Sequence, residues 1–274
     1  MSGRGGTTAG LLSPRMPQAD AMAQPCSPNS IWNGRRIGIT GARGALGQAL
    51  STALRQQGAE VIGLTHSQPP AVTDADGPNR WLTWRCGEEE RLDPQLAELD
   101  ILVINHGINP QGHQNAEAVN QSLEINALSS WQLMQRFERC ALSTPRNTPC
   151  ELWVNTSEAE IQPAISPVYE LTKRLIGQLV SLRGANLSPI DRQRFLIRKL
   201  VLGPFRSDLN PIGVMSAPFV STQILLQARL GLRLIIVTPN PMTYILMPLN
   251  ELARRIYFQA INRLDQSKSR NHHW

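Results

Sequence analysis

The stretch "RIGITGARGALGQALSTALRQQGAEVIGLT", residues 36–65, decides the fold of this chain. "RIGIT" predicts a short buried strand that ends at Thr40, and "EVIGLT" predicts a second strand. Between them, "ALGQALSTALRQQG" has apolar residues at helical spacing and ends on Gly58. A strand, a glycine turn, a helix and a strand form the βαβ unit that opens a doubly wound (Rossmann) α/β fold.

The glycine turn "TGARGALG" has the spacing of a dinucleotide-binding loop. Gly41 permits the tight turn, Gly44 lets the backbone approach a pyrophosphate, and Gly47 lets the helix pack closely on the sheet. The helix start at Ala45 and Leu46 offers free N–H groups and a positive dipole end to phosphates. We therefore expect a dinucleotide site here; a structural turn without a ligand is the alternative.

The end of the second strand bears on which dinucleotide is bound. A carboxylate for the ribose 2′-hydroxyl is usual there, but this chain has Thr65, His66 and Ser67. Because no carboxylate is present there, nothing at this strand end would repel a 2′-phosphate. The Arg43 guanidinium could pair with such a phosphate. We expect NADP(H) in preference to NAD(H), with Arg43 and His66 among the cofactor-binding residues. The alternative for Arg43 is a solvated loop charge.

The remaining chain alternates strands with helices of 12 or more residues, which favours a parallel sheet with helices on both faces in a single domain. We expect this domain over residues 35–240, a flexible tail over 1–34, and an amphipathic helix with a basic tail over 241–274. Further strands are expected at 80–86, 100–108, 151–157, 194–204 and 232–238, and helices at 116–142, 169–183 and 216–231.

The composition is that of a globular chain long enough for a substantial core. Of 274 residues, 41% are hydrophobic and 18% charged, with a formal net charge of +6. The basic excess could favour an anionic partner such as a phosphorylated cofactor or an acidic membrane. No run of five basic residues occurs, so we do not expect nucleic acid as a partner.

The cysteines and the apolar runs bear on compartment. Cys26, Cys86, Cys140 and Cys150 form no CxxC pair, so we expect reduced cytoplasmic thiols and no metal site. No apolar run reaches the ~18 residues that span a bilayer. The first 34 residues lack an apolar core, so a secretory signal is not expected. An organelle transit segment, or a true start at Met16 or Met22, stays open.

The C-terminal segment predicts an amphipathic helix. Its apolar residues Leu249, Leu252, Ile256, Ala260 and Leu264 form one stripe, with arginines elsewhere. We expect the stripe to pack on the domain or on a second copy of the chain. The alternative is a basic amphipathic helix that lies on a membrane surface.

"VYELTKRLIG", residues 168–177, places Tyr169 and Lys173 four residues apart on one helix face. A cation beside a phenol stabilises the phenolate, so this pair could perform acid–base chemistry near neutral pH. A half-buried Tyr beside a solvated Lys is the alternative.

Three motifs together resemble the short-chain dehydrogenase/reductases over roughly residues 36–238. These are "TGARGALG", "INHGI" at 104–108, and "VYELTK" preceded by "NTS". The second half is also similar to short-chain dehydrogenase domains fused to sterol-desaturase-like membrane proteins.

The resemblance implies a catalytic tetrad. Tyr169 matches the residue that exchanges a proton with the substrate oxygen, and Lys173 the one that binds the nicotinamide ribose and lowers the pKa of the tyrosine. Ser157 matches the serine that holds the substrate carbonyl, with Thr156 as a competitor. Asn126 matches the asparagine that anchors a water relay; a surface helix residue is its alternative.

The resemblance also implies cofactor contacts away from the glycine loop. Asn105 and Gly107 match the segment after the fourth strand. Gly203 and Pro204 occupy the place of a Pro-Gly pair in inverted order, which leaves contact by residues 202–205 open.

Four further positions have less specific roles. Cys86 or Gly87 stands where the family contacts adenine. Glu158 and Glu160 could meet a polar substrate, although solvated loop acids are the expected reading.

We therefore expect an NADP(H)-dependent oxidoreductase that transfers hydride between nicotinamide and a carbonyl or secondary alcohol. The apolar residues 242–247 favour a lipid-like substrate. The alternative is a non-catalytic dinucleotide-binding protein, a redox sensor or scaffold associated with a lipid-modifying membrane enzyme. We expect a cytoplasmic location, with peripheral membrane contact and homo-oligomer formation left open.

Overall fold

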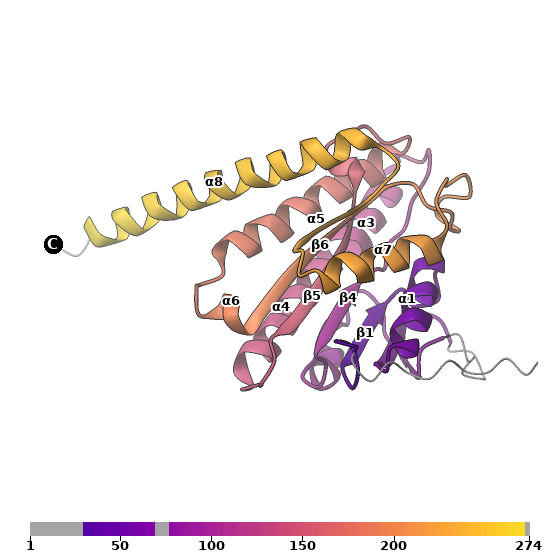
Figure 1. Cartoon of the computed structure of the whole chain (residues 1–274). Helices are drawn as coiled ribbons and strands as arrows, with labels where there is room; N and C mark the ends of the chain where they lie inside the picture. Colours follow the sequence, from indigo (N-terminus) through magenta and orange to yellow (C-terminus); the bar gives the residue numbers. More distant parts are fainter. Residues whose placement is uncertain (1–29, 69–76, 272–274) are drawn as a thin grey trace, which may run out of the picture.

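The computed structural model describes residues 30–68 and 77–271, with the side chains of the last helix described up to Ile261. Its centre is one sheet of parallel strands in the order β3-β2-β1-β4-β5-β6-β7 (Figure 1). The predicted doubly wound fold is confirmed. The strands are β1 Arg36–Thr40, β2 Glu60–Thr65, β3 Arg80–Thr83, β4 Ile101–Ile104, β5 Cys150–Ser157, β6 Phe195–Leu202 and β7 Leu234–Val237.

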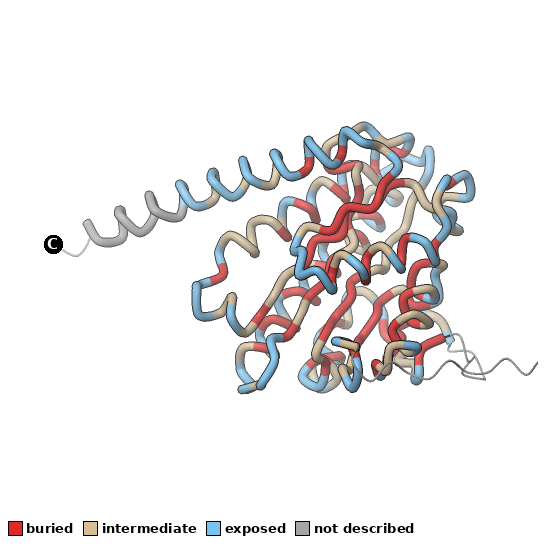
Figure 2. The backbone as a smooth tube through the Cα atoms, viewed as in Figure 1, coloured by how far each residue is buried: buried red, intermediate tan, exposed pale blue. Residues whose placement is uncertain are grey.

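Helices cover both faces of this sheet, as parallel strands require. Figure 2 shows the buried backbone concentrated in the strands, with exposed residues on the outer sides of the helices. The α-helices are α1 Ala45–Gln56, α2 Asp93–Leu96, α3 Ala116–Leu123, α4 Ser129–Ser143, α5 Pro167–Asn186, α6 Asp191–Arg194, α7 Ala217–Arg229 and α8 Pro241–Asn271. Short 3-10 helices are η1 Glu89–Leu92 and η3 Glu158–Glu160, and η2 Glu124–Leu128 is π-helical.

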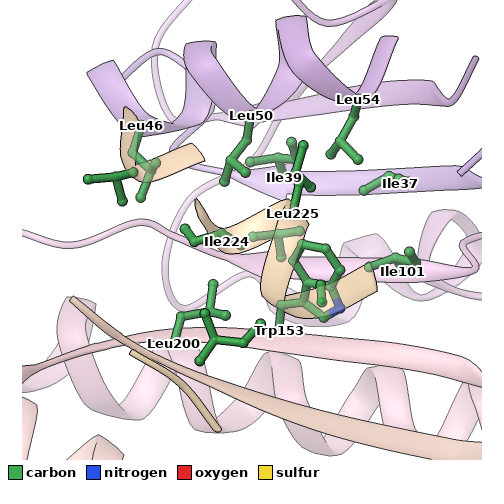
Figure 3. Packing of buried hydrophobic residues seen from close by; sticks show 14 of the residues in the cluster. Ile37, Ile39, Leu46, Leu50, Leu54, Ile101, Trp153, Leu200, Ile224 and Leu225 are labelled. Carbon is green, nitrogen blue, oxygen red and sulfur yellow. The ribbon is translucent and has the colours of Figure 1, made fainter. Parts of the chain in front are cut away.

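Two apolar layers hold the helices to the sheet. Leu46, Leu50 and Leu54 of α1 pack with residues of α7 on one face, around Ile39 and Trp153 of the strands (Figure 3). Residues of α4 and α5 pack on the other face. Each fully buried leucine contributes roughly 1.5–3 kcal/mol of transfer free energy.

The order of strands reverses between β1 and β4, and this reversal positions the site. In doubly wound sheets, ligands bind outside the carboxyl ends of the strands at such a point. The loops after β1 and β4 touch: a Cβ on Gly41 would lie 2.9 Å from His106 Cα. The glycine loop and "INHGI" therefore share one edge of the sheet.

Several predicted boundaries differ from the structure. β3 ends at Thr83 and β4 at Ile104, short of the predicted ends. The helix predicted over residues 116–142 contains the π-helical turn η2 between α3 and α4. Between β3 and β4 the chain forms η1 and α2, which the sequence analysis did not predict, and residues 69–76 lie outside the described part of the chain.

Helix α8 runs along α5 and then continues past the end of the domain (Figure 1). Met247 is fully buried, whereas Leu249, Leu252 and Ile256 are 54–60% exposed. The stripe does not pack on the described domain, and Glu251 of α8 instead accepts a hydrogen bond from Ser181 of α5 at 2.9 Å. Packing of the stripe on a second copy of the chain stays a prediction. The predicted stripe member Leu264 has a side chain outside the described set. No helix in the described ranges is long and apolar enough to span a bilayer.

Candidate active site

The glycine loop makes a tight turn between β1 and α1. Gly41 adopts φ +62°, which favours glycine, and a Cβ on Gly47 would lie 2.4 Å from the Gly41 carbonyl oxygen. Gly44 begins α1 in an extended conformation, with no side-chain cap and no acid in the first turn. The first N–H groups of α1, at Ala45 and Leu46, thus have no side-chain cap and no acid beside them, and such groups can bind an anion.

Arg43 reaches the end of β2. Its Nη1 donates to the Ser67 hydroxyl at 2.7 Å and to the Gln68 carbonyl at 3.4 Å. His66 is exposed beside them. The guanidinium thus lies at the strand end where a ribose 2′-substituent is recognised in this fold.

Thr40, which the sequence analysis did not select, joins the loops after β1 and β4. Its hydroxyl accepts hydrogen bonds from the N–H groups of Asn105 at 2.9 Å and His106 at 3.2 Å. Asn105 Oδ1 in turn accepts from Asn155 Nδ2 at 2.9 Å. The position of Thr40, at a strand end directly before the glycine turn, is the pattern that could have identified it.

His106, in the middle of "INHGI", is a second site residue that the sequence analysis did not select. Its Nδ1 lies 2.8 Å from Thr40 Oγ1, and its ring packs edge-on against Trp84 with 5.3 Å between centroids. Burial, assisted by the charge of Lys173, lowers the pKa of His106 to about 4. The imidazole is therefore neutral at neutral pH and acts as a hydrogen-bonding spacer.

Ser157 and Tyr169 meet at the carboxyl end of β5. The Ser157 hydroxyl lies close enough to the Tyr169 phenol to lower its pKa, and Ser157 Oγ accepts a hydrogen bond from Ala159 N–H at 3.2 Å. Thr156, the competing residue, donates instead to the Leu200 carbonyl in the sheet at 3.1 Å. The geometry favours Ser157 as the partner of Tyr169.

Lys173 is buried on the same face of α5 as Tyr169. Its Nζ lies 5.6 Å from the Tyr169 ring centroid and donates to the Asn155 carbonyl at 3.1 Å. Burial lowers the pKa of Lys173 to about 8, although the Glu160 charge opposes this effect.

We expected the pKa of Tyr169 to be lowered, and this prediction is wrong for the chain without bound cofactor or substrate. Burial raises the pKa of Tyr169, the hydrogen bond from Ser157 lowers it, and the Glu158 charge raises it. The phenol is therefore held in its protonated form.

Asn126 lies in the π-helical turn η2 and is buried. Its amide accepts from Ile108 N–H at 2.8 Å and donates to the Ile108 carbonyl at 2.9 Å and to Thr172 Oγ1 at 3.0 Å. A Cβ on Gly107 would lie 3.0 Å from its oxygen. The alternative of a surface residue is wrong: Asn126 ties the loop after β4 to α5.

The loop after β6 folds back on itself. A Cβ on Gly203 would lie 2.4 Å from Thr238 Oγ1, and the Pro204 carbonyl accepts from Val214 N–H at 3.1 Å. Ser157 is paired with Leu202 in the β5–β6 register, and Gly203 and Pro204 directly follow Leu202. Gly203 and Pro204 therefore lie at the same sheet edge as Ser157. At the other side of the site, Gly87 N–H donates to the buried Glu89 carboxylate, next to the half-buried Cys86.

The reading of Glu158 and Glu160 as solvated acids is wrong. Glu158 Oε2 accepts hydrogen bonds from the hydroxyls of Thr238 and Thr243. The Glu160 side chain is 0% exposed and pairs with Lys199. Both acids anchor the turn that follows Ser157, and their partners come from distant parts of the chain.

Comparison with known proteins agrees with a dinucleotide-dependent site. Residues 37–158 match the NAD dependent epimerase/dehydratase family. The monoglucosyldiacylglycerol epimerase of Synechocystis sp. is 42% identical over 233 residues, which are 84% of this chain and 55% of the relative. The chain therefore spans little more than half the length of that relative.

Solved structures share the fold at low sequence identity. A short-chain dehydrogenase from Burkholderia cenocepacia in complex with NADP is 18% identical, with a TM-score of 0.66 over 79% of this chain and 92% of that chain. One from Sphingobium yanoikuyae in complex with NADPH is 15% identical, with a TM-score of 0.65 over 82% and 95%. The chain thus has the Rossmann fold of the short-chain dehydrogenases, and its residues 37–158 match the NAD dependent epimerase/dehydratase family.

Proposed function

We propose that this chain is an NADP(H)-dependent oxidoreductase of the epimerase type, which inverts a hydroxyl-bearing carbon in the sugar of a glycolipid. The observation that carries the proposal is the pairing of Tyr169 and Lys173 on one face of α5, with Lys173 Nζ 5.6 Å from the Tyr169 ring centroid, beside the Ser157 hydroxyl. The 42% identity to a monoglucosyldiacylglycerol epimerase supports the substrate class.

The glycine loop would hold the pyrophosphate, because its uncapped helix start and its close glycine contacts fit that group. Arg43 and His66 would bind the 2′-phosphate, and Lys173 the nicotinamide ribose. Further cofactor contacts would come from Asn105, Gly107, Gly203 and Pro204. When bound, the nicotinamide supplies a hydride acceptor that can give the hydride back, so that a carbon is inverted without net oxidation.

Tyr169 would move the proton in this reaction. It takes the proton of the sugar hydroxyl as the C–O bond becomes C=O, and returns it once the other face of the carbonyl is presented. Ser157 holds the substrate oxygen and stabilises the phenolate through its hydrogen bond. Burial raises the pKa of Tyr169 in the chain alone, so the phenol would first have to lose its proton to solvent, and the nearby Lys173 ammonium would favour the phenolate that accepts the substrate proton.

An assay with a glucosyldiacylglycerol in detergent micelles and a catalytic amount of NADP⁺ tests this function. We expect a second hexosyl epimer to form in heavy water without deuterium at the inverted carbon, because hydride transfer keeps that hydrogen within the site. Net NADPH consumption with formation of an alcohol would show a carbonyl reductase instead. Cofactor binding without any conversion would show the non-catalytic alternative.

Helix α8 supports a lipid-bound substrate. Met242, Ile245, Leu249, Leu252 and Ile256 recur at intervals of three and four residues and are 51–60% exposed. Such a stripe suits the headgroup region of a bilayer. Peripheral membrane contact through this face is therefore part of the proposal; homo-oligomer formation is its alternative. The narrower resemblance to domains fused to sterol-desaturase-like proteins stays a prediction.

A further inference from the structure

One face of α5 carries Tyr169, Lys173, Gly177 and Ser181 at intervals of four residues. Gly177 has no side chain, and the carboxyl group of Glu160 fills that place. A Cβ on Gly177 would lie 2.0 Å from Glu160 Cδ. A carboxylate from the turn after Ser157 thus joins this row one helical turn from Lys173.

Glu160 is held there by cations from two other elements. Its Oε2 accepts hydrogen bonds from Lys199 of β6 at 2.8 Å and from Arg254 of α8 at 2.8 Å. Glu251 of α8 pairs with the same two cations, at 2.7 Å and 3.1 Å. Lys199 also donates to Ser181 and to the Gly177 carbonyl. Two carboxylates and two cations balance in this buried cluster.

The second oxygen of Glu160 is not used by these cations. Glu160 Oε1 is buried and has no hydrogen-bond partner among the described residues. Lys173 is only 6% exposed and donates to a neutral carbonyl, that of Asn155. A buried ammonium without a bonded carboxylate favours its neutral form, and the charge of Glu160 opposes this.

The other acids nearby have partners of their own. Glu158, two residues earlier, binds Thr238 and Thr243. Glu170 on α5 pairs with Arg174 at 2.9 Å. Glu160 is thus the nearby acid with a buried oxygen that has no partner among the described residues, and its carboxyl group lies against Gly177, four residues from Lys173.

We propose that Glu160 is a positioning residue for the reaction proposed above: its carboxylate keeps the Lys173 ammonium charged at neutral pH, and Lys199 and Arg254 fix it on α5. The inference rests on the proposed roles of Tyr169 and Lys173. It also makes α8, through Arg254, a structural part of the active site.

The titration of Lys173 can be measured without any turnover. The chain has three lysines, at positions 173, 199 and 268, so ¹³C-lysine labelling gives three ε-carbon signals that Lys→Arg variants assign. We expect the wild-type Lys173 midpoint at about 8. Glu160→Gln should lower this midpoint by ~1 pH unit, since one nearby opposite charge is lost. The matched control Glu158→Gln should leave it in place.

The sign of the shift separates electrostatics from simple loosening. If Glu160 only packed the turn, its loss would admit water to Lys173 and the midpoint would rise. A rise or an unchanged midpoint in folded Glu160→Gln overturns the proposal. Because the readout needs no substrate, a failed epimerase assay leaves this result standing and overturns only the proposed function.

A second pair of variants serves if Glu160→Gln does not fold. Arg254→Met removes one cation that is hydrogen-bonded to Glu160. The negative charge of Glu160 is then less compensated, so the titration midpoint of Lys173 should rise. Arg254→Lys keeps a cation at the same position while it disturbs the same packing, so it should leave the midpoint in place, whereas loosening alone would raise the midpoint in both variants. Equal midpoints in the two arginine variants overturn the proposal.

Discussion

The Glu160 carboxyl group lies directly over Gly177, where a Cβ would be 2.0 Å from Glu160 Cδ. The Gly177→Ala variant must therefore displace a buried, ion-paired carboxylate. We expect a loss of about 1–3 kcal/mol in the free energy of unfolding, as for other overpacked sites. Urea unfolding followed by circular dichroism measures this loss.

The same helix offers the matched control. A Cβ on Gly184 of α5 would meet no heavy atom within 4 Å. Gly184→Ala should therefore stabilise the protein by roughly 0.5–1 kcal/mol, because alanine is the better helix former. Equal effects of the two substitutions would contradict the contact between Glu160 and Gly177.

Tyr169→Phe removes the proton donor and acceptor but keeps the ring. We expect turnover to fall by roughly 10²–10⁴-fold, the usual contribution of general acid–base catalysis, with NADPH affinity nearly unchanged. Steady-state kinetics and fluorescence titration measure the two effects. Tyr257→Phe, at an exposed position on α8, controls for the loss of a phenol and should retain full turnover. Full turnover in Tyr169→Phe would refute the proposed role.

Arg43→Leu tests the preference for NADPH. The guanidinium at the end of β2 would contact the 2′-phosphate, and a hydrogen bond to a charged group contributes about 1.5–3 kcal/mol. NADPH affinity should fall roughly 10–100-fold, while NADH affinity in the same variant should stay unchanged and so serves as the internal control. A parallel loss for both cofactors would point to a structural role of Arg43.

The parts of the site that the sequence predicted are the local ones. The spacing of Gly41, Gly44 and Gly47 between a strand and a helix predicted a dinucleotide-binding turn. The four-residue interval between Tyr169 and Lys173 predicted that they share one helix face. In both motifs the local geometry is determined by residues that are close along the chain. The order of strands and helices followed from periodicity for the same reason.

The parts that the sequence did not predict depend on distant contacts. Glu160 is buried because Lys199 and Arg254, 39 and 94 residues later, meet it. From the sequence it is one of two acids in a loop, for which solvation is the ordinary expectation. The direction of the Tyr169 pKa likewise depends on burial, which four-residue spacing does not reveal.

His106 makes stability depend on pH. Its pKa is about 4 in the folded chain, against an ordinary value of about 6.5 when unfolded. Between these values the unfolded chain binds more protons, so this stabilisation is present above pH ~6.5 and is lost as pH falls toward 4. The full loss is ~3 kcal/mol by the linkage relation.

Urea unfolding at pH 7.0 and pH 4.5 measures this effect. His106→Gln should show a smaller loss of stability between the two pH values than the wild type. His113→Gln, in an exposed loop, should keep the wild-type dependence. An unchanged pH dependence in His106→Gln would contradict a buried neutral imidazole.

The exposed stripe of α8 predicts binding to lipid vesicles. Leu249 and Ile256 are 58% and 60% exposed on one helix face, so a bilayer could bury both. The double variant Leu249→Ser, Ile256→Ser should reduce co-sedimentation with anionic liposomes by at least ~10-fold, given about 0.8 kcal/mol per buried methylene. Leu230→Ser removes a 70% exposed leucine after α7 and should bind as the wild type does. Equal binding of both variants would contradict membrane contact through the stripe. Concentration-dependent dimers that only the double variant abolishes would assign the stripe to a second copy of the chain.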